Sequence, residues 1–427
     1  TTEILFLASV RNGRITVSRM KILQINNYHY LKGGAEKVYF ETSRILEQYG
    51  GHEVIHFSVL DKEIVESKTK KYFIASRKYD TPINKIRNLL SFFYSFEAKY
   101  NLTRLIKNEK PDIAHLHIFY GRLSSSILGV LKKHKIPVVM TVHEYKMLCP
   151  QYLFLDNKKN ICEKCANGNS LYCVLEKCNK GNFFNSLISA LEVKFRDIFF
   201  SYEKNIDKFI FVSDFIYKKH LEYIPSLEKK SVVIENIIDF NKFKPKIKKG
   251  DYFLYFGRLS EEKGLLNLLT IAKINQNINY KIVGTGLLEN KLKDIVANNS
   301  LRNVEFLGAK YDEELIDIIQ NCSFVIAPSI VYESFGLSIV ESFSCSKPVI
   351  ASNLGSYSEL INSSRGFLFK YNEISDLMKK INCANNLNSK MYMEMAENCN
   401  FFIKNRYSEI DYYNKLINAY NDVFKKE

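Results

Sequence analysis

The sequence lacks any long apolar segment. Its hydrophobic runs all fall well short of the roughly 18 residues that a helix needs to cross a bilayer, so we expect a soluble or peripheral protein. The early run Ile4–Ala8 has no basic leader and is too short for a secretory signal. We therefore expect the fold to start at Met20, with residues 1–19 as an upstream extension or cloning remnant. Asp-x-Asp is also absent, so no carboxylate pair for Mg²⁺ is evident and an anionic ligand would need protein cations.

Positive charge is concentrated in the first part of the chain. Residues 1–250 hold 42 Lys and Arg against 25 Asp and Glu, an excess of 17 positive charges, whereas the remainder is nearly balanced. A basic half favours an anionic partner, either a membrane surface or a polyanion. The nine cysteines, with no secretory signal evident, indicate a reducing compartment.

The order of apolar runs predicts two α/β domains. At 427 residues the chain is long enough for two cores, and short apolar runs alternate with amphipathic stretches, as in parallel sheets covered by helices. We predict strands at 21–25, 53–57, 113–117, 138–142, 209–212, 252–256, 280–283, 304–307, 324–327 and 349–351. We predict helices at 35–48, 84–108, 123–135 and 183–205, and a C-terminal helix within 406–427 that packs back across both domains.

The basic stretch 241–250, which contains Pro245 and Gly250, is typical of a linker. It would join an N-terminal domain at 20–240 to a C-terminal domain at 251–405. Ligands of doubly wound sheets bind beyond the carboxyl ends of the strands, so we expect the chemistry in the cleft between the domains.

Two glutamates flank a predicted turn from strand to helix near Phe335 and Gly336. Free backbone N–H groups at such a turn can bind an anion. Glu333 could accept hydrogen bonds from sugar hydroxyls, and Glu341, inside the helix, could accept two from a ribose diol. Taken alone, the acidic pair fits a surface helix with a favourable N-terminal acid better.

Three further turns could contact phosphate. Arg258 and Lys263 flank a predicted helix start, where two cations could hold a diphosphate, although such cations are also common on surfaces. Gly284 and the pair Gly33–Gly34 follow predicted strands and would let the backbone approach a ligand closely. Each could equally be a plain tight turn.

Together, and in this order, these motifs resemble the retaining glycosyltransferases of family 4 from Met20 to about Leu368. The resemblance implies the GT-B fold, in which two Rossmann-like domains face each other across a cleft, and a nucleotide-diphosphate-sugar donor. Two departures, Ile237 where the family usually has glycine and Ser356 in place of the second glycine of a pair, bear on the donor pocket. The donor-binding residues that it implies are Gly33, Gly34, Arg258, Lys263, Gly284, Glu333, Ser334, Phe335, Gly336, Leu337 and Glu341.

Histidines mark the other side of the expected cleft. In the run Asp112–His117 two histidines alternate on one face of a predicted strand. The resemblance implies that His117 contacts the reacting sugar and is catalytic together with Glu333, Arg258 and Lys263, whereas we expect His115 to be a satisfied buried residue. His143 and Glu144 end the next strand and would face the acceptor or support the residues that do.

Five cysteines fall between Cys149 and Cys178, in a polar insertion at 149–181. The spacing of Cys162, Cys165, Cys173 and Cys178 could close a tetrahedral zinc site that orders the insertion. The spacing matches a zinc ribbon only loosely, so free thiols are as good a reading.

Residues 84–110 combine Lys and Arg with Leu and Phe. Such a segment can lie in a membrane interface or simply cover the sheet as an amphipathic helix.

The sequence therefore predicts a retaining glycosyltransferase that needs no metal for catalysis and acts on a glycan or lipid-linked acceptor in capsule, O-antigen or other surface polysaccharide synthesis. We expect it in the cytoplasm, peripheral at the inner face of the membrane, with no nucleic-acid partner. The alternatives are a sugar-nucleotide epimerase of GT-B form and a non-enzymatic, zinc-stabilised polyanion-binding protein. Donor sugar, base, acceptor linkage and oligomeric state cannot be read from the sequence.

Overall fold

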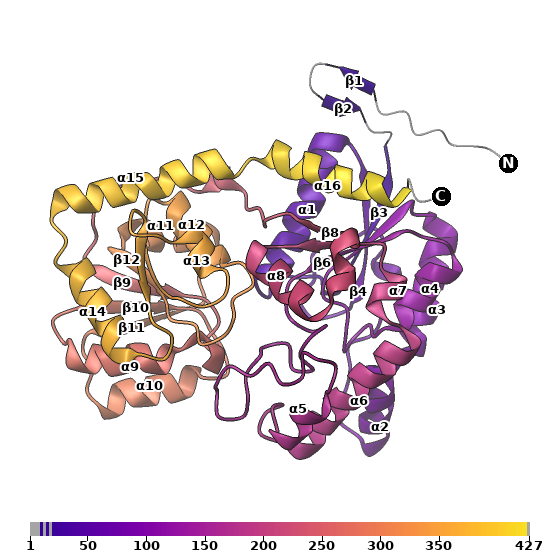
Figure 1. Cartoon of the computed structure of the whole chain (residues 1–427), viewed down its shortest axis with the longest axis horizontal. Helices are drawn as coiled ribbons and strands as arrows, with labels where there is room; N and C mark the ends of the chain where they lie inside the picture. Colours follow the sequence, from indigo (N-terminus) through magenta and orange to yellow (C-terminus); the bar gives the residue numbers. More distant parts are fainter. Residues whose placement is uncertain (1–8, 12–13, 17–18, 425–427) are drawn as a thin grey trace.

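The structure, a computed structural model, describes residues 9–11, 14–16 and 19–424, so the run Ile4–Ala8 lies outside the described residues. The short strands β1 (Ser9–Arg11) and β2 (Arg14–Thr16) pair antiparallel. From Met20 onward the chain builds two six-stranded parallel sheets, one in each half of the molecule (Figure 1). The predicted pair of doubly wound sheets is confirmed.

The N-terminal sheet has the strand order β4-β3-β5-β6-β7-β8. Its inner strands are buried on both faces, which is why they read as nearly continuous apolar runs. The strands are β3 (Lys21–Tyr28), β4 (Glu53–Val59), β5 (Ile113–Leu116), β6 (Val138–Val142), β7 (Lys208–Phe211) and β8 (Ser231–Val233).

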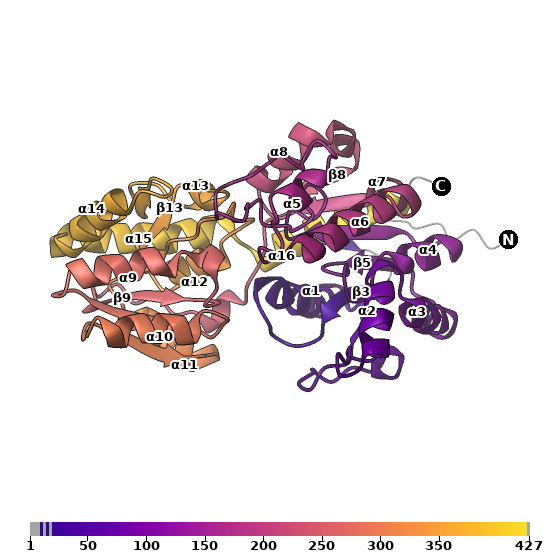
Figure 2. The ribbon, with the colours of Figure 1, turned by 90° about the horizontal axis from the view of Figure 1, so that it is seen from below.

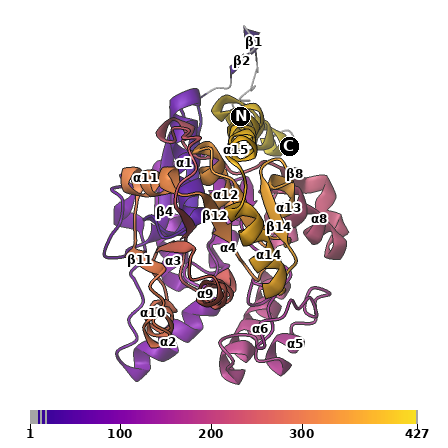
Figure 3. The same cartoon turned by 90° about the vertical axis from the view of Figure 1, so that its left-hand side faces the viewer.

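The C-terminal sheet has the strand order β11-β10-β9-β12-β13-β14. Helices α9, α10 and α14 pack together on one face, whereas α12 and α15 pack on the other (Figure 3). The strands are β9 (Tyr252–Phe256), β10 (Asn279–Val283), β11 (Val304–Gly308), β12 (Phe324–Ala327), β13 (Val349–Ser352) and β14 (Gly366–Phe369).

Most helices cross over between parallel strands. In the N-terminal half they are α1 (Gly34–Gly50), α2 (Pro82–Phe93), α3 (Phe96–Glu109), α4 (Ser126–Lys133), α5 (Leu171–Leu175), α6 (Phe183–Phe199), α7 (Tyr202–Asn205) and α8 (Asp214–Tyr223). In the C-terminal half they are α9 (Leu265–Ile274), α10 (Glu289–Asn298), α11 (Asp312–Asn321), α12 (Leu337–Ser344), α13 (Tyr357–Leu360), α14 (Ile374–Asn385), α15 (Ser389–Arg406) and α16 (Glu409–Phe424). Short 3₁₀ turns are η1 (Lys70–Tyr72), η2 (Pro225–Lys230), η3 (Phe240–Lys242) and η4 (Glu261–Lys263).

Two predicted helices are broken in the structure. The stretch 84–108 forms α2 and α3 instead of one helix, because Ser95 has extended backbone and its side chain accepts a hydrogen bond from the Ala98 N–H, which starts a new helix. The stretch 183–205 likewise ends as α6 at Phe199 and resumes as α7.

Two strands of the six-stranded sheets were not predicted, and neither were the short strands β1 and β2. Both β8 and β14 are short strands at sheet edges, where each pairs on one side only. β8 is only partly buried, so its apolar run is weak, and β14 begins at Gly366, directly after a turn at residues 363–365.

The last two helices cross the molecule. Figure 1 shows α15 along the C-terminal half and α16 along the N-terminal half, where it contacts α1, β6 and β7. Tyr412 Oη and Thr42 Oγ1 lie 2.8 Å apart, and Tyr420 Oη lies 2.7 Å from His115 Nδ1. Figure 2 shows the same helix α16 from below, behind α1 and α6. The end of the chain therefore completes the core of the first half.

Candidate active site

The segment between β12 and α12 lies beyond the carboxyl end of the C-terminal sheet, and the predicted turn at Phe335 and Gly336 is confirmed. Gly336 has φ 98°, and a Cβ there would lie 2.9 Å from the ring of Tyr357, so the turn requires glycine. Helix α12 therefore starts at this edge of the sheet, where its first residue, Leu337, lies close to Gly34 of the N-terminal half.

Glu333 is held as an ionised group at this turn. Lys263 Nζ donates to Glu333 Oε1 over 2.7 Å, and Ser329 Oγ donates to the same oxygen over 2.5 Å. Burial acts to raise the pKa of Glu333, but the charge and hydrogen bond of Lys263, with the hydrogen bond of Ser329, outweigh it and lower the pKa. Lys263, which is predicted to bind the diphosphate, and Glu333, which is predicted to bind the sugar, belong to separate motifs. In the structure they form one ion pair.

The glycine loop of the N-terminal half approaches the C-terminal half closely. A Cβ at Gly33 would lie 3.2 Å from Arg258 Nη2, and one at Gly34 would lie 2.9 Å from Leu337 Cδ1. A side chain at Gly34 would therefore displace the end of the Leu337 side chain. The residues predicted to hold a diphosphate and to start α12 are brought together with the Gly-Gly loop by tertiary structure.

Glu341 forms an ion pair that the sequence did not suggest. Its carboxylate is buried and accepts a hydrogen bond from Lys37 Nζ, which comes from the first turns of α1. Lys37 follows Gly34 by three positions, a spacing that was available in the sequence but has no distinctive pattern. Glu341, which is predicted to accept hydrogen bonds from the ribose, therefore has the cation of Lys37 beside it.

Three other predicted donor residues have structural partners. The Ser334 carbonyl accepts from Ser213 Oγ over 2.7 Å, and Phe335 is buried against Tyr407. The Gly284 N–H donates to the Gly308 carbonyl over 2.7 Å, so it is engaged within the sheet edge. These residues shape the turn around the cleft.

A chain of buried imidazoles lies at the end of β5 and β6. His117 Nδ1 lies 2.9 Å from His143 Nε2, and no described residue hydrogen-bonds the buried Nε2 of His117. Burial lowers the pKa of both, that of His143 to about 3, so both rings are neutral near pH 7. His115 is buried between Tyr420 and Thr141, which confirms it as a satisfied residue.

Glu144 differs from the other carboxylates of the site. Its Oε1 is buried and no described residue hydrogen-bonds it. Burial raises the pKa of Glu144 to about 7, against the lowering effects of a hydrogen bond from Tyr120 and the charge of Lys146. Glu144 is thus a carboxyl group that changes protonation near neutral pH.

The cysteine-rich insertion contacts the two loops of the C-terminal half that are predicted to bind the donor. Tyr332, which precedes Glu333, donates from Oη to Glu163 Oε1 over 2.7 Å, and Lys159 pairs with Glu261 in η4 over 2.5 Å. Glu163 also accepts from Tyr223 and Lys219 of the N-terminal half. No local pattern in the sequence indicates this contact, because Glu163 is distinguished only by lying between two cysteines.

All nine cysteines are free thiols. Among residues 9–11, 14–16 and 19–424, no group of three or more His, Cys, Asp or Glu side chains is placed to hold a metal ion. The zinc site at Cys162, Cys165, Cys173 and Cys178 therefore remains a prediction from spacing, with no ligand cage in the structure to support it.

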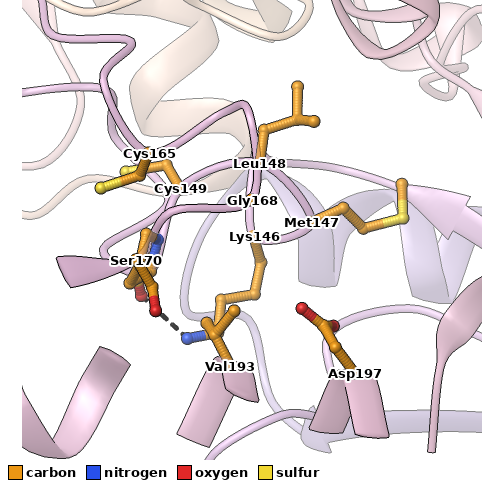
Figure 4. Close-up of a pocket in the computed structure, with 10 residues that line it drawn as sticks. Lys146, Met147, Leu148, Cys149, Cys165, Gly168, Ser170, Val193 and Asp197 are labelled. Carbon is orange, nitrogen blue, oxygen red and sulfur yellow. Dashed lines mark hydrogen bonds between the residues drawn. The ribbon is translucent and has the colours of Figure 1, made fainter. Parts of the chain in front are cut away.

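A small cavity of about 20 Å³ lies beneath the insertion, with Cys149 and Cys165 on one wall (Figure 4). Lys146 crosses it, donating to the Pro150 carbonyl over 2.8 Å and pairing with buried Glu192 over 3.0 Å. The cavity has room for about one water molecule. It does not serve as a substrate pocket.

Sequence models of two families match consecutive parts of the chain. Glycosyltransferase Family 4 matches residues 32–242, and Glycosyl transferases group 1 matches residues 237–400. The two regions meet at the connection between the sheets.

Curated relatives match most of the chain. An uncharacterized glycosyltransferase of Methanocaldococcus jannaschii is 27% identical over 333 residues, covering 77% of this chain and 79% of that protein. The Escherichia coli UDP-Gal:alpha-D-GlcNAc-diphosphoundecaprenol alpha-1,3-galactosyltransferase is 25% identical over 358 residues, covering 78% and 81%.

Solved structures share the fold. HepE of Anabaena, in complex with UDP and glucose, superposes with a TM-score of 0.65 at 17% identity, covering 94% of this chain and all of that chain. Sucrose-phosphate synthase of Thermosynechococcus elongatus gives 0.68 at 15% identity, covering 96% of this chain and all of that chain.

Proposed function

Because the chain belongs to glycosyltransferase family 4, an enzyme family with the GT-B fold, we propose that it transfers a sugar with retention from a nucleotide-diphosphate-sugar to a glycan or lipid-linked acceptor, without a catalytic metal. Since the chain is an enzyme, the non-enzymatic polyanion-binding alternative falls. The observations that support the transfer most directly are the ion pair Lys263–Glu333 and the close approach of Arg258 Nη2 to Gly33 in the Gly33–Gly34 loop.

Two cations take the place of a metal in this proposal. As the bond between the anomeric carbon and the phosphate oxygen breaks, its electron pair goes to the diphosphate, whose growing charge is stabilised by Arg258 and Lys263. The acceptor hydroxyl forms the new bond on the same face of the sugar, and its proton passes to the departing phosphate oxygen. Charge, atoms and configuration are then accounted for.

The carboxylates orient the donor. Glu333, held ionised at the turn, accepts hydrogen bonds from the sugar hydroxyls while Lys263 turns to the phosphate. Glu341 accepts from the ribose diol, which requires the Lys37 ion pair to open or share its oxygen. The Nε2 of His117 is left to contact the sugar, and His143 and Glu144 face the acceptor.

Two relatives support the class of substrate. The name of the Escherichia coli relative states a UDP-sugar donor and a diphosphoundecaprenol-linked acceptor, and the HepE structure contains UDP. We therefore place this enzyme in surface polysaccharide synthesis, at the cytoplasmic face of the membrane. In the part of the chain that the structure describes, none of the helices has the length and hydropathy to cross a bilayer.

A screen of nucleotide-sugars by thermal stabilisation tests the donor, because a tight ligand raises apparent stability by mass action. Glu341→Ala should weaken donor binding, whereas Glu333→Ala should mainly lower turnover, since sugar contacts tighten in the transition state. Unchanged affinity and turnover in both variants would sink the assignment. Epimerised nucleotide-sugar without an acceptor product would favour the epimerase.

A further inference from the structure

Helix α2 exposes an apolar face that nothing in the described chain covers. None of its residues is buried, and Ile83, Ile86 and Leu90 have exposed fractions of 77%, 61% and 65%. A helix that covers a sheet would bury such a stripe. Helix α3, which follows it, does so, because Leu102, Leu105 and Ile106 are buried. The expected membrane segment 84–110 therefore divides into an exposed helix and a sheet-covering helix.

Helix α5 of the insertion and helix α6, which follows the insertion, continue the same surface. Phe184, Ile198 and Phe199 on α6 have exposed fractions of 69%, 72% and 64%, and Leu175 on α5 has 73%. Helix α6 contacts both α5 and α2, and the three helices lie together at the lower right of Figure 1. Exposed apolar side chains that gather on adjoining elements mark an interaction surface rather than scattered surface residues.

The joint between α2 and α6 is itself packed. The rings of Phe93 and Phe195 lie 6.0 Å apart and edge to face, and both side chains are partly buried. The aromatic end of α2 is therefore packed against α6, whereas the aliphatic side chains of α2 remain exposed. The three helices are therefore joined through α6, which contacts both α2 and α5.

Cations surround the exposed apolar side chains. Lys85 and Arg87 on α2, and Lys177, Lys180 and Lys194 around α5 and α6, are exposed. The acidic side chains on and directly after these helices are fewer: Glu176, Asp197 and Glu192, of which Glu192 is buried in an ion pair with Lys146. A basic rim around an apolar face is complementary to an anionic lipid surface, on which each nearby cation contributes about 1 kcal/mol.

We propose that α2, α5 and α6 form a membrane-binding platform that lies on anionic lipid. The apolar side chains would enter the interface shallowly and the cations would contact head groups. This refines the partner of the proposed function, because a lipid-linked acceptor would then be presented beside the enzyme's cleft.

The insertion connects this platform to the donor loops. It runs from β6 through Glu163, which bonds Tyr332, to α5 and α6 on the platform. An acceptor whose lipid tail stays in the bilayer would thus reach the cleft alongside a segment that contacts both.

The test is flotation of the full chain with phosphatidylglycerol-containing vesicles and with phosphatidylcholine vesicles. Wild type should float with the anionic vesicles, less so at high salt. The triple variant Ile83→Ser, Ile86→Ser and Leu90→Ser should lower vesicle binding about tenfold, since it removes three exposed apolar side chains. Failure of wild type to bind, or full binding by the variant, overturns the platform.

A second triple variant, Phe184→Ser, Ile198→Ser and Phe199→Ser, should show the same loss if α6 shares the surface, and unaltered binding would remove α6 from it. A matched control replaces three exposed apolar residues of the C-terminal half, Ile274, Met393 and Phe401, by serine and should bind like wild type.

Sedimentation without lipid tests the alternative occupant of this surface, which is a second copy of the chain. A dimer that the α2 and α6 variants both dissociate would overturn the membrane assignment. Donor affinity without vesicles should be unchanged in both variants. If vesicle binding behaves as expected but no nucleotide-sugar binds or reacts, the proposed function fails and the platform stands.

Discussion

The two halves of the molecule supply different kinds of group to the cleft. At the strand ends of the C-terminal half, opposite charges are paired, as in Lys263 with Glu333. At the strand ends of the N-terminal half lie neutral imidazoles, His117 and His143, hydrogen-bonded to each other. In the proposed reaction, charge develops on the diphosphate, so the fixed charges lie on the side where they are needed.

The difference also concerns proton equilibria. All eight histidines lie in the first 220 residues, and burial lowers the pKa of seven of them, for example to about 4 for His29 and about 3 for His115. The C-terminal half has none. The N-terminal half, which holds all the histidines, therefore depends on pH in this way, whereas the C-terminal half does not.

Acid should destabilise the N-terminal half first. A histidine with a lowered native pKa stabilises the fold above its unfolded value of 6.5, and this stability is lost as pH falls toward the native value. At about pH 5, protonation of each of these seven histidines in the unfolded state lowers the free energy of unfolding by up to about 2 kcal/mol. This loss outweighs the opposite contributions of Glu36 and Glu144. Hydrogen exchange at about pH 5 should show opening at β3, β5 and β6 before β9 and β12. Equal loss of protection in both sheets would contradict the comparison.

Removing a cation from the charged side should lower turnover. Lys263→Ala should cost about tenfold to a hundredfold in kcat, and Arg258→Ala a similar amount, because the leaving diphosphate loses a counter-charge. The matched control is Lys293→Ala, whose surface pair with Glu289 lies on α10. EDTA should leave activity intact. Activity that chelation abolishes and Mg²⁺ restores would place the charge on a metal instead.

Glu144 is the exception on the neutral side and can sharpen the comparison. Its native pKa of about 7 exceeds its unfolded value, so its ionisation destabilises the fold as pH rises from 4.5 through 7. Glu144→Gln should raise the free energy of unfolding by about 1 to 3 kcal/mol at about pH 8, with the gain vanishing toward pH 4.5. Urea titrations at both pH values measure this, with exposed Glu228→Gln as control. A gain independent of pH would disprove the assigned protonation.

The smallest effect is expected where the insertion contacts the charged side. Glu163→Ala and Tyr332→Phe should each weaken donor binding about threefold to tenfold, and the double variant no further, because both remove the Tyr332–Glu163 hydrogen bond. The KM for the donor should change more than kcat does. Glu176→Gln, which breaks the exposed pair with Lys164 in the same insertion, is the control. Additive losses would show that Glu163 does not act through Tyr332.

Much of the architecture was predictable from the sequence. The central strands of both sheets bury both faces, so they appear as short apolar runs, and the turn at Gly336 follows from its neighbours. The edge strands β8 and β14 and the break between α2 and α3 at Ser95 were harder to predict. Partial burial and a single capping residue leave only weak patterns in the sequence.

The sequence by itself determined the alternation of strands and helices and the order of the motifs, since both depend on local periodicity and on residues close together in the chain. Only the tertiary structure decided that Lys263 pairs with Glu333, that Lys37 reaches Glu341 and that Glu163 bonds Tyr332. Each of these pairs joins residues at least 70 positions apart. Contacts of that kind depend on how two sheets and an insertion pack, and no local pattern records it.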